Sequence, residues 1–124
     1  MAKPKFTFGI SDFVNAVYQS VFGKNVPDNF LNDREAYIIG LEGGDISPES
    51  FFEQVLLNDY TAEKFSANED FLKLCFKVLE VKNVPEKDWE FWLSRFQTRS
   101  RRGVVLGLTL TKFWEKFCTK YEVK

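Results

Sequence analysis

Apolar residues recur at intervals of three and four along most of the chain, the spacing that places them on one face of an α-helix. The first such stretch contains two adjacent rows with i, i+4, i+8 spacing, formed by Phe13, Val17, Val21 and by Val14, Tyr18, Phe22. Ser11 can cap the free N–H groups at its start, and Gly23 can adopt the left-handed conformation that often ends helices. The pattern therefore predicts a helix over about residues 12–22.

Further helix starts follow in the first half of the chain. Asp28 can cap a helix that Gly43-Gly44 ends. Ser47-Pro48-Glu49 combines a capping residue, a proline for the first helical position and an acid in the first turn, which makes it the clearest helix start in the chain. A short helix can restart at Asn58 or Asp59 and reach Phe65.

In the second half, Ser66 and Glu69 have the capping-box spacing and predict a helix over about 67–81. This segment is apolar nearly all round, so we expect it to lie at the centre of the fold. Pro85-Glu86 and Ser100 predict two more helices, and a break at Thr109–Thr111 precedes a last one. The β-branched run 104–111 leaves a strand as an alternative there. The fold class predicted is all-α, a compact bundle of about six to eight helices.

The chain also repeats itself. Residues 13–21 align with residues 71–79 at an offset of 58, and at the same offset Lys24-Asn25-Val26-Pro27 falls on Lys82-Asn83-Val84-Pro85. Glu63-Lys64-Phe65 matches Glu115-Lys116-Phe117 at an offset of 52, which indicates a short deletion in the second copy. We therefore expect two pseudo-repeated helical units, about 12–65 and 70–117, rather than a solenoid, for which at least three repeats are needed.

Domain organisation follows from length. A chain of 124 residues fits one domain, with residues 1–10 as an N-terminal arm and 11–124 as the helical domain. The arm has no apolar run of signal-peptide length, and no window approaches the roughly 20 apolar residues of a membrane span. We expect a soluble domain without membrane insertion, which can equally be part of a larger surface or assembly protein.

Composition excludes several classes of function. With 17 basic and 18 acidic residues, the net charge is −1, which argues against a dedicated nucleic-acid-binding protein. The chain has no histidine, so it cannot use Ser-His or Cys-His catalysis. Cys75 and Cys118 lie in apolar helical patterns and are expected in the core. The acids around Gly43-Gly44 do not match an EF-hand loop, and no phosphate-binding glycine motif is present. We expect neither catalysis nor a cofactor or metal.

Candidate contact residues come from the aromatic and basic positions. Phe6 and Phe8 lie in the N-terminal arm, which either closes over the core or contacts a partner. The arginines at positions 95, 99, 101 and 102 form what the sequence indicates is the only basic cluster. Cations in the first turn after Ser100 oppose the helix dipole, so we expect an acidic neighbour or an anionic partner there. Arg99, Arg101 and Arg102 are the predicted protein contacts, and a solvated, acid-paired loop is the alternative.

The tryptophans allow a second hypothesis. Trp89, Trp92 and Trp114 could stack on a glycan or another small ligand, because a flat indole covers a sugar face while its N–H donates a hydrogen bond. The alternative is that all three lie in the core, since they occupy apolar faces of predicted helices.

Several segments together resemble a known family. Tyr18-Gln19-Ser20-Val21-Phe22-Gly23 is similar to the Tyr-Arg-Gln-Val-Phe-Gly segment of phycobilisome linker domains. Residues 44–51 resemble their Gly-Glu-Ile-Ser-x-x-Glu-Phe turn and helix, and residues 71–85 their second helix and its proline-terminated turn. The resemblance runs from about Phe13 to Phe117 and implies an all-α domain without catalysis.

An uncharacterised helical domain attached to bacterial surface and secreted RTX-type or S-layer proteins is similar to an equal degree. It shares the paired helical units, the tryptophan after the second proline turn, here Trp92, and the Ser-Arg helix start, here Ser100-Arg101. We therefore expect a protein–protein interaction or scaffold module that helps to hold a larger assembly together. The alternative is a surface-associated domain that binds a glycan or other small ligand through exposed aromatics.

Overall fold

A computed structural model describes residues 9–123, and within that range the chain forms eight α-helices and no strand. The all-α class predicted from the sequence is therefore confirmed. In chain order the helices are α1 (Ile10–Phe22), α2 (Asp28–Gly43), α3 (Pro48–Leu56), α4 (Asp59–Lys64), α5 (Asn68–Val78), α6 (Glu86–Arg95), α7 (Arg101–Leu108) and α8 (Lys112–Lys120).

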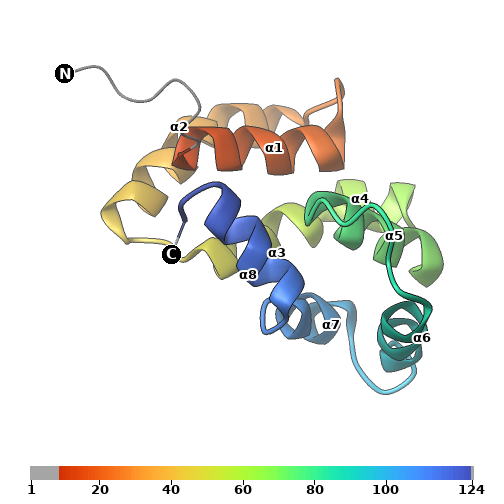
Figure 1. Cartoon of the computed structure of the whole chain (residues 1–124). Coiled ribbons are helices and arrows are strands. Elements are labelled where there is room, and N and C mark those ends of the chain that lie inside the picture. Colours follow the sequence, from red (N-terminus) through yellow and green to blue (C-terminus); the bar gives the residue numbers. More distant parts are fainter. Residues whose placement is uncertain (1–8, 124) are drawn as a thin grey trace.

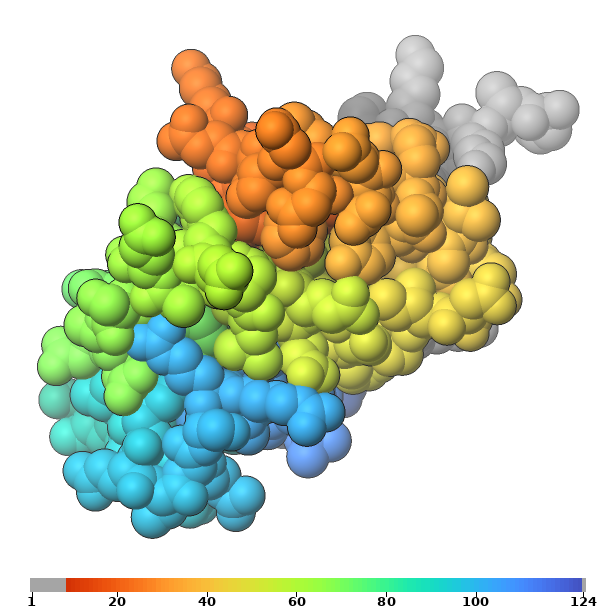
Figure 2. All heavy atoms as spheres, turned by 180° about the vertical axis from the view of Figure 1, so that it is seen from behind, coloured from red at the N-terminus to blue at the C-terminus, as the bar shows by residue number. Residues whose placement is uncertain are grey.

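The helices form one compact bundle (Figure 1). Helix α1 packs against α2, α3 and α5, while α3 contacts α7 and α5 contacts α6. Helices α2 and α6 lie at opposite ends of the molecule. On the face seen in Figure 2, the segment from α2 to α4 covers the upper part, and α6 and α7 form the lower end. The two halves of the chain thus meet through α1, α3, α5 and α7.

Aromatic rings from both halves fill the core. Phe13 is fully buried, and its ring lies 5.7 Å from that of Phe51 and 5.4 Å from that of Phe117, measured between centroids. Helix α5 buries six side chains, in agreement with the central position predicted for it. Cys75 and Cys118 are free thiols buried in this core, and burial raises the pKa of the Cys118 thiol to about 12. Both thiols are core residues, as predicted.

Most helix ends follow local signals. The side chains of Ser47, Asn58 and Ser100 each accept a hydrogen bond from a backbone N–H in the first turn of α3, α4 and α7. Such caps are worth about 1 kcal/mol each, and they fix where these helices begin. Gly23 and Gly44 end α1 and α2 with positive φ values of 59° and 78°. The break predicted at Thr109–Thr111 is also present, with Thr111 capping α8.

Other boundaries differ from those predicted. Helix α1 is capped by Gly9 rather than Ser11, and α2 by Pro27 rather than Asp28. The capping box predicted at Ser66 is wrong, because α5 begins after Ala67 without a side-chain cap and ends at Val78. In the structure Ser66 instead contacts α7, because its carbonyl oxygen accepts a hydrogen bond from Arg101. The strand alternative for 104–111 is also wrong, because α7 occupies most of that run.

Candidate binding surfaces

Arg101 is held by contacts within the chain. Its Nη2 donates to the carbonyl oxygen of Ser66 at 2.7 Å, and its Nε donates to Asn68 Oδ1 at 3.1 Å. The guanidinium also lies 4.4 Å from the centroid of the Phe71 ring. Partial burial lowers the pKa of Arg101 from its ordinary value. These contacts fasten the start of α7 to Ser66 and to the first turn of α5.

Arg102 has an acidic neighbour, one of the two outcomes expected for cations in the first turn of this helix. Its Nε donates to Glu53 Oε2 on α3 at 2.6 Å. The carboxylate offsets the unfavourable interaction between the guanidinium and the positive end of the α7 dipole. Because this ion pair is exposed, it contributes at most about 1 kcal/mol.

Arg99, unlike Arg101 and Arg102, lines an open groove of about 370 Å³ between α6 and α7. We call this the aromatic groove, and it is lined by Phe91, Trp92, Arg95, Arg99, Gly103, Gly107, Leu110 and Thr111. The Trp92 indole rests directly on α7, because a Cβ added at Gly107 would lie 2.8 Å from Trp92 Cζ3. Glycine at position 107 thus allows the ring to approach the α7 backbone.

The aromatic groove combines exposed apolar surface with positive charge. Leu110 is 89% exposed and Phe91 47%, the first being the most exposed large apolar residue between positions 9 and 123. The Arg95 guanidinium lies 4.3 Å from the centroid of the Phe91 ring. In the part of the chain that the structure describes, Arg95 and Arg99 form no ion pair. The groove therefore offers two uncompensated cations beside apolar side chains.

The three tryptophans lie in different environments. Trp114 is only 5% exposed, and its Nε1 donates to Glu49 Oε2 at 3.2 Å, so its ring offers no face on which a sugar could stack. Core packing, the alternative reading, is correct for Trp114. Trp92 and Trp89 are half-buried, the first in the aromatic groove and the second in a separate pocket.

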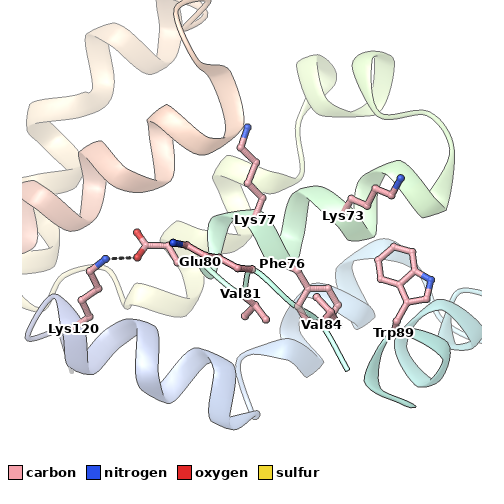
Figure 3. Close-up of a pocket in the computed structure, with 9 residues that line it drawn as sticks. Lys73, Phe76, Lys77, Glu80, Val81, Val84, Trp89 and Lys120 are labelled. Atoms are coloured by element: carbon pink, nitrogen blue, oxygen red, sulfur yellow. Dashed lines mark hydrogen bonds and ion pairs between the residues drawn. The ribbon is translucent and has the colours of Figure 1, made fainter. Parts of the chain in front are cut away.

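That pocket, which we call the lysine pocket, has a volume of about 590 Å³ and is formed by α5, the following turn, α6 and α8 (Figure 3). Its lining consists of Lys73, Phe76, Lys77, Glu80, Val81, Lys82, Val84, Trp89 and Lys120. Lys73 and Lys77 extend from α5, Trp89 belongs to α6, and Lys120 reaches from α8 to Glu80. Four cations and one anion thus surround an apolar, partly aromatic floor.

Glu80 organises one end of the lysine pocket. Its backbone has a φ of 60°, in the left-handed region that favours glycine, and its carboxylate accepts hydrogen bonds from Lys120 Nζ and from the Tyr121 hydroxyl. The hydrogen bond to Glu80 raises the pKa of Lys120. By contrast, Lys73, Lys77 and Lys82 make no ion pair or side-chain hydrogen bond with any residue in the described range.

Sequence reasoning missed this second basic cluster. The prediction that the arginines form the only one is wrong, because lysines from α5, the turn after it and α8 line one pocket. A local signal was present: Lys73 and Lys77 on α5, and Lys116 and Lys120 on α8, are i, i+4 pairs that share a helix face. Only the tertiary packing of α8 beside α5 brings the two pairs to one region.

The remaining predictions concern other parts of the molecule. Phe6 and Phe8 lie outside the described residues, so their role as contacts stays a prediction. Across residues 9–123 no group of three or more acidic or cysteine side chains is arranged to hold a metal ion. Over the same range, none of the helices has the length and apolar character needed to cross a lipid bilayer.

Comparison of the chain with models of known protein families, with characterised proteins and with solved structures yields no significant match. The candidate surfaces therefore have to be interpreted from their own geometry.

Proposed function

We propose that this protein is a non-catalytic interaction module that holds components of a larger assembly together and that binds its partner through the aromatic groove. The partner segment carries large apolar side chains flanked by acidic ones. The observation that carries the proposal is the exposure of Leu110, 89%, beside Trp92 and two arginines without acidic partners among the described residues.

The composition of the aromatic groove supports binding of protein rather than of a neutral small molecule. Tryptophan and arginine are enriched among the residues that dominate protein interfaces, and apolar anchors bind best where water is excluded around them. Trp92 and Phe91 pack edge to face, with ring centroids 5.1 Å apart, so they form a firm wall for an apolar anchor. Arg95 and Arg99 add a requirement for acidic groups on the partner.

Among the sequence-predicted contacts, Arg99 lines this groove. Arg101 instead binds the Ser66 carbonyl oxygen, and Arg102 pairs with Glu53 on α3. The resemblance to phycobilisome linker domains, and to the helical domain of bacterial surface proteins, agrees with a binding role without catalysis. Phe6 and Phe8 remain proposed as an additional contact from the arm.

The experiment selects short peptides that bind the full chain from a display library and measures their affinities by fluorescence anisotropy. Selected peptides are expected to combine acidic and large apolar residues. The double change Arg95→Glu/Arg99→Glu and the single change Leu110→Asp should each weaken binding by about tenfold or more. Removal of residues 1–10 tests the separate contribution of the arm.

Ile39→Asp provides the matched control, because Ile39 is also an exposed apolar residue, at 63%, but lies on α2 at the other end of the molecule. It should leave the affinity unchanged. Peptides that bind the Leu110→Asp and Arg95→Glu/Arg99→Glu variants as tightly as the original chain would show that the aromatic groove is not the contact surface. Circular dichroism verifies that each variant remains folded.

We also propose that the bundle consists of two copies of one helical unit. The succession α1 to α4 is followed by a succession α5 to α8, and α1 contacts α5 while α3 contacts α7. Pro27 and Pro85, which end the two Lys-Asn-Val-Pro segments, have φ, ψ values of −60°, 147° and −56°, 141°. Val26 and Val84 both pack against the core. These observations support the duplication read from the sequence.

A second candidate function is small-ligand binding through Trp89. The half-buried position of this indole in the lysine pocket favours it. A glycan remains the ligand expected from the stacking hypothesis, but the lysines around Trp89 favour an anionic ligand.

A further inference from the structure

We propose that the lysine pocket binds a small organic anion that carries a flat ring, with the chemistry of a nucleoside polyphosphate. This site is separate from the aromatic groove, since the two share no lining residue. Its volume of about 590 Å³ lies within the range of roughly 300–1,000 Å³ typical of ligand pockets.

Beside the pocket, the two halves of the chain differ at an aligned position. In the alignment of the two repeats, Phe22 corresponds to Glu80. Phe22 is buried between α1 and α2, with its ring 5.0 Å from that of Phe30 and 5.1 Å from that of Tyr60. Glu80 instead directs its carboxylate toward α8, where it accepts from Lys120. No large ring from position 80 therefore fills the space between α5 and α6.

The charge of the pocket favours an anion. Glu80 compensates Lys120, whereas the ammonium groups of Lys73, Lys77 and Lys82 have no ion pair within residues 9–123. On a chain with a net charge of −1, three such cations at one pocket form a local region of positive potential. Lysine is a common phosphate ligand that acts as a point charge with three donors. Three ammonium groups suit a polyphosphate better than a single carboxylate.

The floor of the pocket favours a flat ring on the same ligand. Phe76 is buried, and its ring centroid lies 6.4 Å from that of Trp89. Val81, Val84 and the half-buried Trp89 complete an apolar surface. In Figure 3 the Lys73 side chain lies beside the Trp89 ring, so a planar group against the indole would place attached phosphates near Lys73. Base–indole stacking of this kind is worth about 1–3 kcal/mol per ring in nucleic-acid-binding proteins.

The experiment measures the binding of ATP, adenosine and inorganic triphosphate to the full chain by isothermal titration calorimetry. ATP should bind saturably, one per chain, and at least about fivefold more tightly than either fragment, because only ATP supplies both the ring and the charge. Raising the salt concentration should weaken ATP binding. The double change Lys73→Gln/Lys77→Gln should lower the ATP affinity by about tenfold, since each substitution removes one exposed charge pair between a lysine and the phosphates of ATP.

The duplicated turn provides a matched control. Lys82→Gln should weaken ATP binding, whereas Lys24→Gln, the same change in the same Lys-Asn-Val-Pro context of the first half, should not. Leu110→Asp should also leave ATP binding intact, which separates this test from that of the aromatic groove. All these positions are exposed, so the variants are expected to fold, and the urea midpoint verifies this.

Four results would overturn the proposal. The first is the absence of saturable ATP binding at about 1 mM, the weak end of specific recognition. The second is equal binding of ATP to the Lys82→Gln and Lys24→Gln variants. The third is a triphosphate affinity equal to that of ATP, which would indicate a site for phosphate alone. If a longer single-stranded oligonucleotide binds much more tightly than ATP, the surface instead binds nucleic acid, and the small-ligand proposal is wrong.

Discussion

Helices α2 and α6 each follow a Lys-Asn-Val-Pro segment, yet they are attached to the molecule in different ways. Helix α2 buries Phe30, Ile38 and Leu41, whereas no residue of α6, which lies wholly within the described range, is fully buried. The aromatic residues of α6 are instead partly exposed, and both candidate binding surfaces lie along this helix. Identical turns thus begin one helix that completes the core and another that is available for binding.

The hydroxyl group of Tyr18 contributes to this difference between α2 and α6. The Tyr18 hydroxyl donates to the carbonyl oxygen of Phe30 at 2.8 Å and ties α1 to the first turn of α2. At the sequence offset of 58, Tyr18 aligns with Phe76, which has no hydroxyl and lines the lysine pocket. At the sequence offset of 58, the two halves thus differ in two aligned pairs of residues beside these helices, Tyr18 with Phe76 and Phe22 with Glu80.

The largest expected contrast is between the residues of the aligned pair Phe22 and Glu80. Phe22→Ala should lower the free energy of unfolding by about 3–5 kcal/mol, because it leaves a cavity between α1, α2 and α4. Glu80→Ala should cost about 1 kcal/mol, the value of the exposed contacts with Lys120 and Tyr121. Urea unfolding of both variants measures the difference. Equal losses would contradict the view that only the first half is closed by a buried ring.

Alanine substitution at two glycines tests how rigidly the side chains packed against α2 and against α7 are held. A Cβ at Gly40 in α2 would lie 2.9 Å from Ile46 Cγ2, and one at Gly107 would lie 2.8 Å from Trp92. Gly40→Ala should destabilise the protein by about 1–3 kcal/mol, as overpacking does. Gly107→Ala should cost less, because the half-exposed indole can move outward, and should shift tryptophan emission to longer wavelength. If emission stays unchanged, α6 is held more rigidly than its exposure indicates.

The equivalence of the two halves can be tested inside the core. Val17 and Cys75 align at the sequence offset of 58, and both are fully buried. Cys75→Val should therefore cost less than about 1.5 kcal/mol, as near-isosteric apolar changes usually do. Thermal unfolding measures the loss. A loss well above that figure would mean that the two positions have different surroundings, and the duplication argument would fail.

Exchange of the hydroxyl between the aligned positions should have a smaller effect. Tyr18→Phe removes the hydrogen bond to Phe30 and should cost about 1 kcal/mol. Phe76→Tyr places a hydroxyl at the floor of the lysine pocket and should not raise stability, because the aligned helix α6 is not packed as α2 is. A stabilising Phe76→Tyr change, seen in urea unfolding, would show that α6 can close as α2 does.

The smallest expected effect appears only in alkaline solution. Burial raises the pKa of Tyr18 above its ordinary value of 10.0. The native state therefore keeps the phenol protonated where the unfolded state has begun to lose the proton. The contribution of the protonated Tyr18 phenol to the free energy of unfolding is therefore fully present below pH 10. It should decline as the pH rises above that value. Tyr18→Phe should show a weaker decline in a urea series from pH 8 to 11, and an identical decline would contradict the assignment to Tyr18.

Helix identity could be predicted from the sequence because its signals are local. Ser47, Asn58 and Ser100 each cap the helix that directly follows, so no tertiary information was needed to place those starts. The start of α5 could not be read in this way, because the helix begins after Ala67 and does not use the capping residues that the sequence offers. The candidate surfaces were harder still. Arg99 and Trp92 were named from their positions in the sequence, but the lysine pocket depends on how α8 lies beside α5.

The contacts of Phe13 have a consequence for how the chain folds as it is synthesised. Its ring packs against Phe117 and Tyr121, which lie near the opposite end of the sequence. While the ribosome is still making the first half, α1 therefore lacks several of the residues against which it packs in the folded protein, and its apolar face remains partly exposed to water. Contacts of such sequence separation slow folding, and transiently exposed apolar surface favours aggregation. Completion of the core must wait until α8 has emerged.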